Sequence, residues 1–172
     1  DKLREAIIQL KLPLGSKLNV NELQNQIGVS CTPIREAINR LQQEGLVVYE
    51  NNVGAHIISL EPHDVLEIQQ LAMTLHCAAI RLAMVNGDRE VIVSELKERL
   101  EEYVHAANPH DEVMAVKEFL GTYYHNCGNR RLDRHMLAIQ GQQTLLRHIY
   151  AANVKERGAE AETFRQMLDS TI

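Results

Sequence analysis

The stretch VSCTPIREAINRLQQEGLVVYE, residues 29–50, carries the strongest structural pattern in the sequence. Three apolar side chains in it recur at the spacing of one helical face: Ala37, Ile38 and Leu41. Thr32 is the expected N-cap, with Pro33 in the first helical position, where a missing N–H costs nothing. Gly45 interrupts the helical pattern, and LVVYE at 46–50 has the composition of a strand. We therefore predict a helix that is capped by Thr32, starts at Pro33, stops at Gly45 and leads directly into a strand.

Two shorter helices are predicted before this stretch. The first has apolar residues at helical spacing: Leu3, Ile7 and Leu10. Pro13 and Gly15 end it. The second has Asn19 or Asn21 as its cap, and Gly28 closes it. Because only Val29 and Ser30 separate the second helix from the third, the pair is typical of a helix-turn-helix.

The outward face of the third helix carries polar groups suited to DNA. These are Thr32, Arg35, Asn39 and Gln42. Arg and Asn can make paired hydrogen bonds to guanine and adenine edges, and Thr can reach a phosphate. A plain solvated helix face is the alternative interpretation, because most polar helix faces have no partner.

The rest of the chain is predicted to be a hairpin followed by helices. AHIIS at 55–59 is the second strand, and the hairpin turn lies at 51–54. The later helices are expected at about 62–85, 88–107, 110–127, 130–154 and 160–172. In the second of these, Asp88 is the N-cap and the buried stripe is Val91, Leu96, Leu100 and Val104. The predicted fold class is mainly α, with a winged helix-turn-helix at 1–60 and an all-α bundle at 61–172.

Charge and composition narrow the class of protein. Residues 1–59 hold six Lys or Arg and six Asp or Glu, so the net charge of −5 belongs to the rest of the chain. Aromatic residues make up 4% with no Trp, which disfavours a base-stacking single-strand binder. No stretch approaches the roughly 20 apolar residues of a membrane span, so no membrane partner is expected. The three cysteines lack metal-ligand spacing and indicate a reducing cytoplasm.

No catalytic motif is present in the sequence. It lacks GxSxG, HExxH, a P-loop and a dinucleotide-binding glycine pattern, which argues against an enzyme. Because the chain does not begin with Met and starts inside a predicted helix, we expect either a fragment or an ordered subset of a longer chain. We expect the second domain to be incomplete at its C-terminal end.

The N-terminal third resembles a known family. LREAIIQLKLPLGSKL (3–18) and VSCTPIREAINRLQQEGLVVYENNVGAHII (29–58) are similar to the winged helix of GntR-type bacterial transcription regulators. That family commonly reads I..G.L.PG..L and then VSRTPVREAL.RL..EGLV....RG..V. FLGTYYHNCGNRRL (119–132) resembles FHRALAEASGNPRL of the FCD effector domain found in one branch of the family.

The resemblance implies a homodimer that binds a palindromic double-stranded operator and responds to a small metabolite held by the helical domain. It implies that the third helix enters the major groove while the hairpin wing touches the neighbouring backbone or minor groove. Thr32 and Arg35 match DNA-contacting positions, Arg40 matches a backbone contact, and Gly54 is the glycine of the wing. Asn39 on the helix and His56 on the wing are added as candidate contacts, with an exposed strand residue as the alternative for His56.

Several positions depart from the family pattern. Cys31 stands where the family often has Arg, and Val53 replaces the Arg of the wing. Leu10 and Leu14 replace a usual Gly and Pro after the first helix. Each lost cation removes a phosphate contact, so either the operator differs and binding weakens, or other residues compensate. Cys31 at a helix N-terminus is either a redox-sensitive thiol or, as we favour, a plain substitution.

Many FCD domains bind a divalent metal through an Asp-x3-His pair and two later histidines. By alignment to the motif at 119–132, three of these positions are Val116, Leu120 and Phe164, and the fourth lies beyond Ile172. Apolar side chains offer a cation no lone pair, so we predict no metal and no other cofactor. With Tyr124, these three residues form the candidate effector pocket.

The sequence thus predicts a cytoplasmic, homodimeric, DNA-binding transcriptional regulator that is not an enzyme. The alternative is a divergent dimeric ligand sensor of the same fold with weak or no operator binding.

Overall fold

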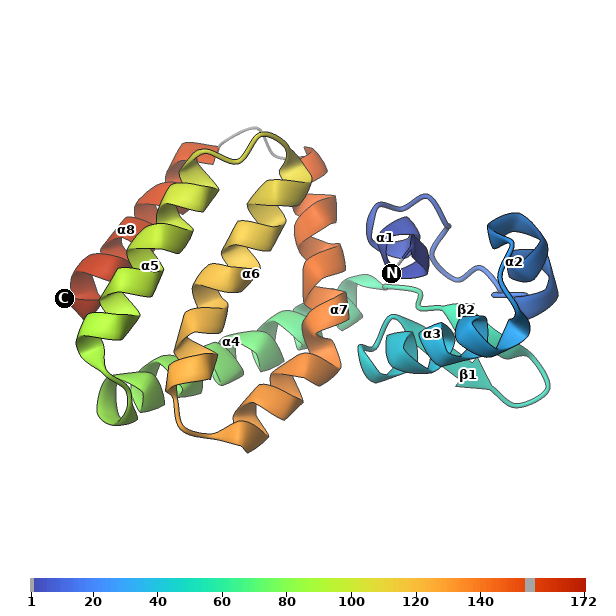
Figure 1. Ribbon diagram of the computed structural model, residues 1–172, viewed down its shortest axis with the longest axis horizontal. Coiled ribbons are helices and arrows are strands. Elements are labelled where there is room, and N and C mark those ends of the chain that lie inside the picture. The colour runs from blue at the N-terminus through green and yellow to red at the C-terminus, as the bar shows by residue number, and fades with distance from the viewer. Residues whose placement is uncertain (1, 154–156) are drawn as a thin grey trace. The chain divides into compact units, whose positions relative to one another are not determined.

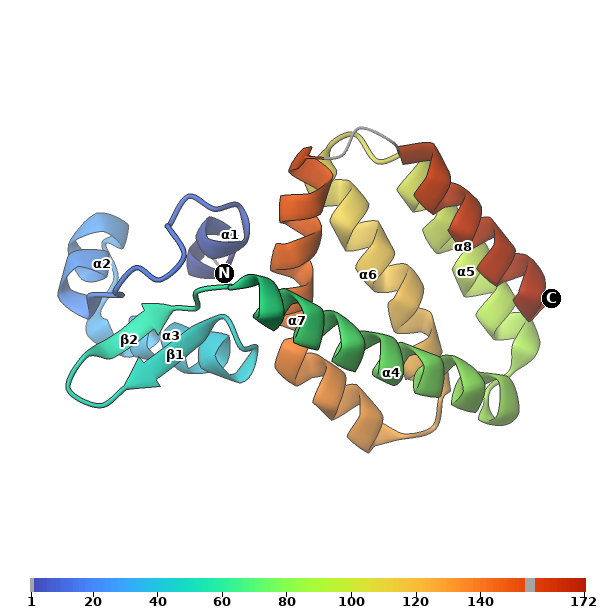
Figure 2. The same cartoon turned by 180° about the vertical axis from the view of Figure 1, so that it is seen from behind.

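The computed structural model describes residues 2–153 and 157–172. In that part of the chain, eight helices accompany one two-stranded antiparallel sheet (Figures 1 and 2). The predicted mainly α fold class is confirmed. The chain divides into two compact units, Asp1–Gln69 with Leu137–Leu145 and Gln70–Met136 with Leu146–Ile172.

The first unit contains three short helices and a hairpin. The helices are α1 Lys2–Ile8, α2 Val20–Ile27 and α3 Cys31–Gln43, and the strands are β1 Val47–Glu50 and β2 Gly54–Ile57. The strands pair with Val47 opposite Ile57 and Glu50 opposite Gly54. The most deeply buried side chains here are Ile7, Ile8, Leu41, Leu46 and Ile57. The predicted helices and hairpin are therefore present, and each strand is slightly shorter than expected.

The ends of α2 follow from its capping residues. The side chain of Asn19 accepts a hydrogen bond from the backbone N–H of Asn21, at 3.0 Å. Gly28 adopts φ +75° and donates its N–H to the carbonyl of Gln24. A left-handed residue at this place ends a helix with little strain only when it is glycine. The turn that leads into α3 is thus encoded locally.

The prediction of Thr32 as the N-cap of α3 is wrong. The helix begins at Cys31, and its N-cap is Ser30 in an extended conformation. Pro33 did not fix the start, because proline fits any position of the first turn, where N–H groups have no partner within the helix. Thr32 is consequently an exposed residue inside the first turn.

The turn after α1 contains a strained leucine. α1 ends at Ile8, so Leu10 does not extend the buried stripe as expected; it is 45% exposed. Leu10 adopts φ +56°, a left-handed conformation that an L side chain disfavours. At the equivalent position the resemblance led us to expect glycine, which adopts this conformation freely.

The second unit is helical. It contains most of α4 (Pro62–Asn86), all of α5 (Arg89–Val104), α6 (Pro109–Asn126) and α8 (Arg157–Thr171), and both ends of α7 (Arg130–Asn153). Asp88 caps α5 as predicted by accepting hydrogen bonds from the N–H groups of Glu90 and Val91. The predicted end of one helix at Val154 lies outside the described residues. The core includes Ile92, Leu96, Phe119, Tyr123 and Phe164.

The predicted core face of α5 is partly wrong. Leu96 and Leu100 are buried as expected, but Val91 and Val104 are 44% and 47% exposed. Their neighbours Ile92 and Tyr103 are buried instead. At each end of the helix, the core-facing position therefore lies one residue closer to the middle of the helix than predicted.

Helix α4 is long and apolar enough to cross a membrane when judged by length and composition. Its best 18-residue window has a mean hydropathy of 1.3, and 17% of that window is buried. This corrects the sequence-based expectation that no stretch approached this length. Core helices of other proteins meet the same criterion, so α4 by itself assigns no membrane role.

Candidate nucleic-acid interface

Helix α3 has one buried face and one exposed face. The buried residues are Ile34, Ala37, Ile38 and Leu41. The exposed residues include the polar set predicted from the sequence: Thr32, Arg35, Asn39, Arg40 and Gln42. The packing side and the solvent side therefore use different positions of the same helix.

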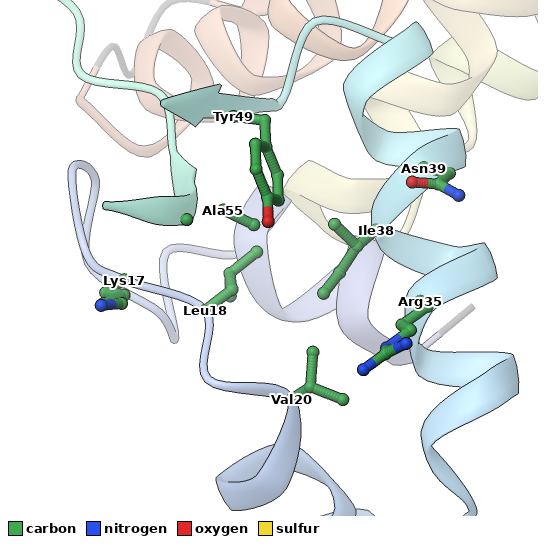
Figure 3. Close-up of a pocket in the computed structure, with 9 residues that line it drawn as sticks. Lys17, Leu18, Val20, Arg35, Ile38, Asn39, Tyr49 and Ala55 are labelled. Atoms are coloured by element: carbon green, nitrogen blue, oxygen red, sulfur yellow. The ribbon is translucent and has the colours of Figure 1, made fainter. Parts of the chain in front are cut away.

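A groove with a volume of about 440 Å³ separates α3 from the hairpin (Figure 3). Arg35 and Asn39 of α3 line one side, and Tyr49 of β1 lies across from them. The floor is apolar and is formed by Leu18, Val20, Ile38 and Ala55. Lys17 and Arg35 are the charged residues that line the groove, so its local charge is positive although the whole chain carries −5.

The N-terminus of α3 lies about one helical turn before Arg35 and is suited to a phosphate. Ser30 makes no side-chain cap hydrogen bond, and the first turn contains no acidic residue. Pro33 has no N–H, which leaves the backbone N–H groups of Cys31 and Thr32 as the donors of the turn. Such N–H groups, together with the helix dipole, favour an anion at this end.

Cys31 is held by α2 and does not face solvent freely. It is half-buried, and its thiol donates a hydrogen bond to the side-chain oxygen of Gln24, 2.8 Å away. An arginine at this position would have to extend away from Gln24 in order to reach DNA.

The wing presents fewer cations than the family pattern suggests. Val53 is 46% exposed beside Gly54, which adopts φ +96°. The ring of His56 is 18% exposed, with Nε2 3.3 Å from Glu50 and Nδ1 3.4 Å from the carbonyl of Gly54. His56 is thus engaged within the wing.

Sequence reasoning did not single out Lys17 and Tyr49. Lys17 pairs with His56 through an isolated antiparallel bridge, which brings the loop before α2 to the edge of the wing. Tyr49 is 63% exposed and lines the groove from β1. Strand alternation places Tyr49 on the same face as the buried Val47, so periodicity gave no signal for its exposure. The position of Lys17 depends on a long-range backbone pairing.

The four residues of the candidate effector pocket lie in or against the core of the helical unit. Val116, Tyr124 and Phe164 belong to the core cluster, and Leu120 packs against it. The rings of Phe119 and Phe164 are 4.8 Å apart between centroids. The site where the family would hold a metal is therefore occupied by packed apolar side chains, which do not fit a cation.

Among the described residues of this unit, the histidine side chains do not form a metal site. The nearest pair is His110 and His148, whose Nδ1 and Nε2 atoms are 3.1 Å apart. No group of three or more His, Cys, Asp or Glu side chains is placed to bind an ion in the part of the chain described.

A half-buried histidine, His76, contacts Tyr124. The hydroxyl of Tyr124 lies 3.0 Å from Nδ1 of His76. Burial, and then the positive charge of Arg147, lowers the pKa of His76 to about 4, while burial raises the pKa of Tyr124. At neutral pH the tyrosine therefore donates to a neutral imidazole.

Two protein families match the chain. The family described as bacterial regulatory proteins, gntR family, matches residues 1–57, and the FCD domain matches residues 67–171. The HTH-type transcriptional regulator YdhC of Bacillus subtilis (strain 168) is 28% identical over 142 residues, which cover 79% of this chain and 63% of YdhC. An HTH-type transcriptional regulator from the TAR-I ttuE-ttuC' intergenic region of Agrobacterium vitis is 35% identical over 111 residues, 63% of this chain and 65% of that protein. The chain thus spans slightly less than two thirds of the length of these two relatives.

Solved structures have the same fold. A transcriptional regulator of Rhodococcus sp. RHA1 aligns over 98% of this chain and 82% of its own, with a TM-score of 0.74 and 20% identity. McbR/YncC of E. coli aligns over 99% of this chain and 84% of its own, with a TM-score of 0.70 and 21% identity.

Proposed function

Because this chain belongs to the GntR family of bacterial transcriptional regulators and carries an FCD domain, we propose that it binds a palindromic double-stranded operator as a cytoplasmic homodimer and that a small-molecule effector controls the binding. The observation that carries the proposal is the positively lined groove between α3 and the wing, on a helix whose N-terminus has no side-chain cap. We assign DNA binding to residues 1–60 and effector binding and dimerisation to residues 61–172. No catalytic activity, cofactor or membrane contact is proposed.

In this proposal α3 lies in the major groove. Arg35 and Asn39 read base edges, since both are exposed, lie one helical turn apart and have the donor and acceptor pattern for guanine and adenine. Thr32 and the N–H groups of the first turn hold a phosphate, and Arg40 contacts the backbone. Gly54 lets the wing approach the DNA closely, and His56 supports the wing through Glu50.

Lys17 and Tyr49 are added to the proposed interface. Lys17 supplies a cation at the edge of the wing, close to the position of the missing Arg at Val53. The hydroxyl of Tyr49 can reach a phosphate or sugar from the opposite side of the groove. These two residues compensate in part for the cations that Cys31 and Val53 do not provide.

A homodimer follows from the size of the reading element. A single α3 covers one half-site, and two copies about one turn of DNA apart give the affinity that a regulator needs. Solution size should therefore be about twice 19.5 kDa. The effector is proposed to bind the helical unit, where Val116, Leu120, Tyr124 and Phe164 are the positions that the family resemblance indicates.

The testing experiment is a footprint on the DNA upstream of the protein's own gene. We expect protection of two half-sites related by a two-fold axis. The double variant Arg35→Ala/Asn39→Ala should lose the footprint, whereas Glu36→Ala, a control on the same exposed helix, should keep it. A folded, dimeric protein with no footprint on this DNA and no preference over random DNA would contradict operator binding.

The second candidate is a dimeric ligand sensor with weak or no operator binding. Cys31, turned toward Gln24, and the uncharged Val53 favour it, because each removes a cation that the family aims at DNA. Binding to random DNA that is weak and nearly independent of salt would favour this candidate.

A further inference from the structure

A groove on the helical unit lies between α4 and α8, above Tyr123 of α6 (the three helices are labelled in Figure 2). Its volume is about 270 Å³. Ile80 and Met84 form one wall and Met167 the other. None of the four residues predicted to form the effector pocket lines this groove, so it is a different site.

The hydroxyl groups of Ser170, Thr171 and Tyr123 in this groove have already used their protons. Ser170 donates to the carbonyl of Gln166 at 2.7 Å, and Thr171 donates to the carbonyl of Met167 at 2.8 Å. Tyr123 and Thr171 have their oxygens 3.1 Å apart. Because a hydroxyl has one proton and that of Thr171 is committed, Tyr123 is the donor in this pair.

The groove therefore offers lone pairs to a ligand. The oxygen of Tyr123 retains its acceptor capacity at the floor, and that of Ser170 does so at the rim. Burial raises the pKa of Tyr123, so the phenol stays neutral in the physiological range. A ligand that donates a hydrogen bond fits these two oxygens, whereas an acceptor such as a carboxylate would have to use the exposed amide of Gln166 instead.

Charge beneath the floor disfavours a cationic ligand. Nε of Arg89 donates to the backbone carbonyl of Thr171 at 2.8 Å, which places a guanidinium close to the floor. A ligand ammonium would meet like charge there. This charge favours a neutral O–H or N–H group as the donor.

The walls favour a flat apolar body. The thioethers of Met84 and Met167 are polarizable and adapt to the shape of an aromatic ring, with which sulfur makes favourable contacts. An apolar cavity of about 150 Å³ is sufficient for benzene. The volume here suits one ring with a short substituent.

We propose that this groove binds small neutral aromatic molecules that carry a hydroxyl or N–H donor, with phenol as the simplest member of the class. The ligand enters between α4 and α8, places its ring between the two methionines and donates to the oxygen of Tyr123. The further step of identifying this ligand as the effector rests on the proposed function. Binding of the ligand to the groove does not require DNA.

Methyl NMR of methionine-labelled protein without DNA tests the proposal. The chain has five methionines; Met84 and Met167 report on the groove, and Met73, Met114 and Met136 serve as internal controls. Phenol should shift the first two methyl signals saturably and leave the other three nearly unchanged. Anisole, which has no donor, should bind about tenfold more weakly, the usual scale for one unmade hydrogen bond.

An isosteric variant tests the hydrogen-bond assignment. Thr171→Val removes the acceptor of Tyr123 and frees its proton to point into the groove, so the preference for phenol over anisole should fall to near unity. Thr74→Val is the matched control, because Thr74 also donates to a backbone carbonyl of its own helix but lies outside the groove. It should keep the preference.

The outcomes separate this inference from operator binding. Equal binding of phenol and anisole to the wild type, a tenfold preference that survives in folded Thr171→Val, or no shift at Met84 and Met167 would each overturn it. None of these results depends on whether the protein binds DNA. Likewise, the absence of a DNA footprint would not contradict ligand binding in the groove.

Discussion

The thiol of Cys31 donates a hydrogen bond to the side-chain oxygen of Gln24 and thereby links the first turn of α3 to α2. This contact occupies the position from which many family members extend an arginine to DNA. The replacement of that arginine by Cys31 therefore has a structural role, and the first prediction tests it.

Replacing Cys31 with arginine should strengthen binding to random DNA. The added cation lies beside the uncapped helix end, so the slope of log K against log salt should steepen by about one unit. Stability should fall slightly, by about 1 kcal/mol, because the bond to Gln24 is lost. Fluorescence anisotropy over a salt series measures the slope.

Cys77→Arg serves as the control for this prediction. It adds the same charge at an exposed position on α4, in the other unit. Its salt slope should match the wild type. An unchanged slope in folded Cys31→Arg would mean that α3 does not approach the phosphates.

Arg35→Ala should weaken specific operator binding by about 1–3 kcal/mol and relax the preference at one base position. The fold should tolerate the change, because Arg35 is exposed and lies off the buried face of α3. Titrations against single-base operator variants provide the measurement. Arg134→Ala, an exposed arginine of α7, is the control; equal effects of the two variants would remove Arg35 from the base contacts.

Leu10→Gly should stabilise the protein by about 0.5 kcal/mol. Relief of the left-handed strain of leucine is worth roughly 1–2 kcal/mol, and the greater chain entropy of unfolded glycine offsets roughly half of it. Asn52→Gly is the matched control, since Asn52 also has a positive φ but asparagine tolerates it. Urea unfolding compares the two; a destabilised Leu10→Gly would show that the exposed leucine makes contacts worth more than its strain.

Protonation of His76 should destabilise the fold below neutral pH. Its pKa is lowered in the folded state to about 4 from an ordinary value of 6.5, so the unfolded chain binds the proton more tightly. The contribution of the neutral His76 ring to the free energy of unfolding is complete above about pH 6.5 and is lost progressively down to about pH 4. The loss should be about 1–2 kcal/mol, because water reaches the half-buried ring and weakens the effect of burial. His76→Gln should flatten this interval in a pH series of urea unfolding, and the exposed His135→Gln should not.

Chelators should leave the melting temperature unchanged. The positions at which the family binds metal are Val116, Leu120 and Phe164, which pack in the core, so no metal-binding energy contributes to folding there. Elemental analysis should find no stoichiometric zinc, nickel or manganese. A melting temperature that falls on chelation and recovers with one added metal per chain would contradict this prediction.

The sequence predicted those parts of the fold that are encoded locally. Asn19 and Gly28 mark the ends of α2 because a cap and a left-handed residue act within a few positions. The start of α3 was misplaced because Thr32 and Ser30 are both good caps and Pro33 is compatible with either. The face of α5 was misjudged because apolar residues stand side by side at 91–93, and periodicity alone does not decide which of them faces the core.

The candidate sites divide in the same way. The exposed positions on α3 followed from helical spacing, because its buried residues define the opposite face. Lys17 was missed because it reaches the wing by pairing with His56, thirty-nine residues away. The groove above Tyr123 was missed because its character depends on which hydroxyl donates to which carbonyl, and only the three-dimensional arrangement shows this.

The separation of buried and exposed positions on α3 has an evolutionary consequence. Most mutations destabilise a protein, and selection removes those that lower its stability below the threshold needed for function. Arg35 and Asn39 contribute little to the core, so they can change and redirect the regulator to another operator without approaching that threshold. Ile38 and Leu41 preserve the scaffold meanwhile. New operator preferences are thus accessible to this helix through single substitutions that the fold does not oppose.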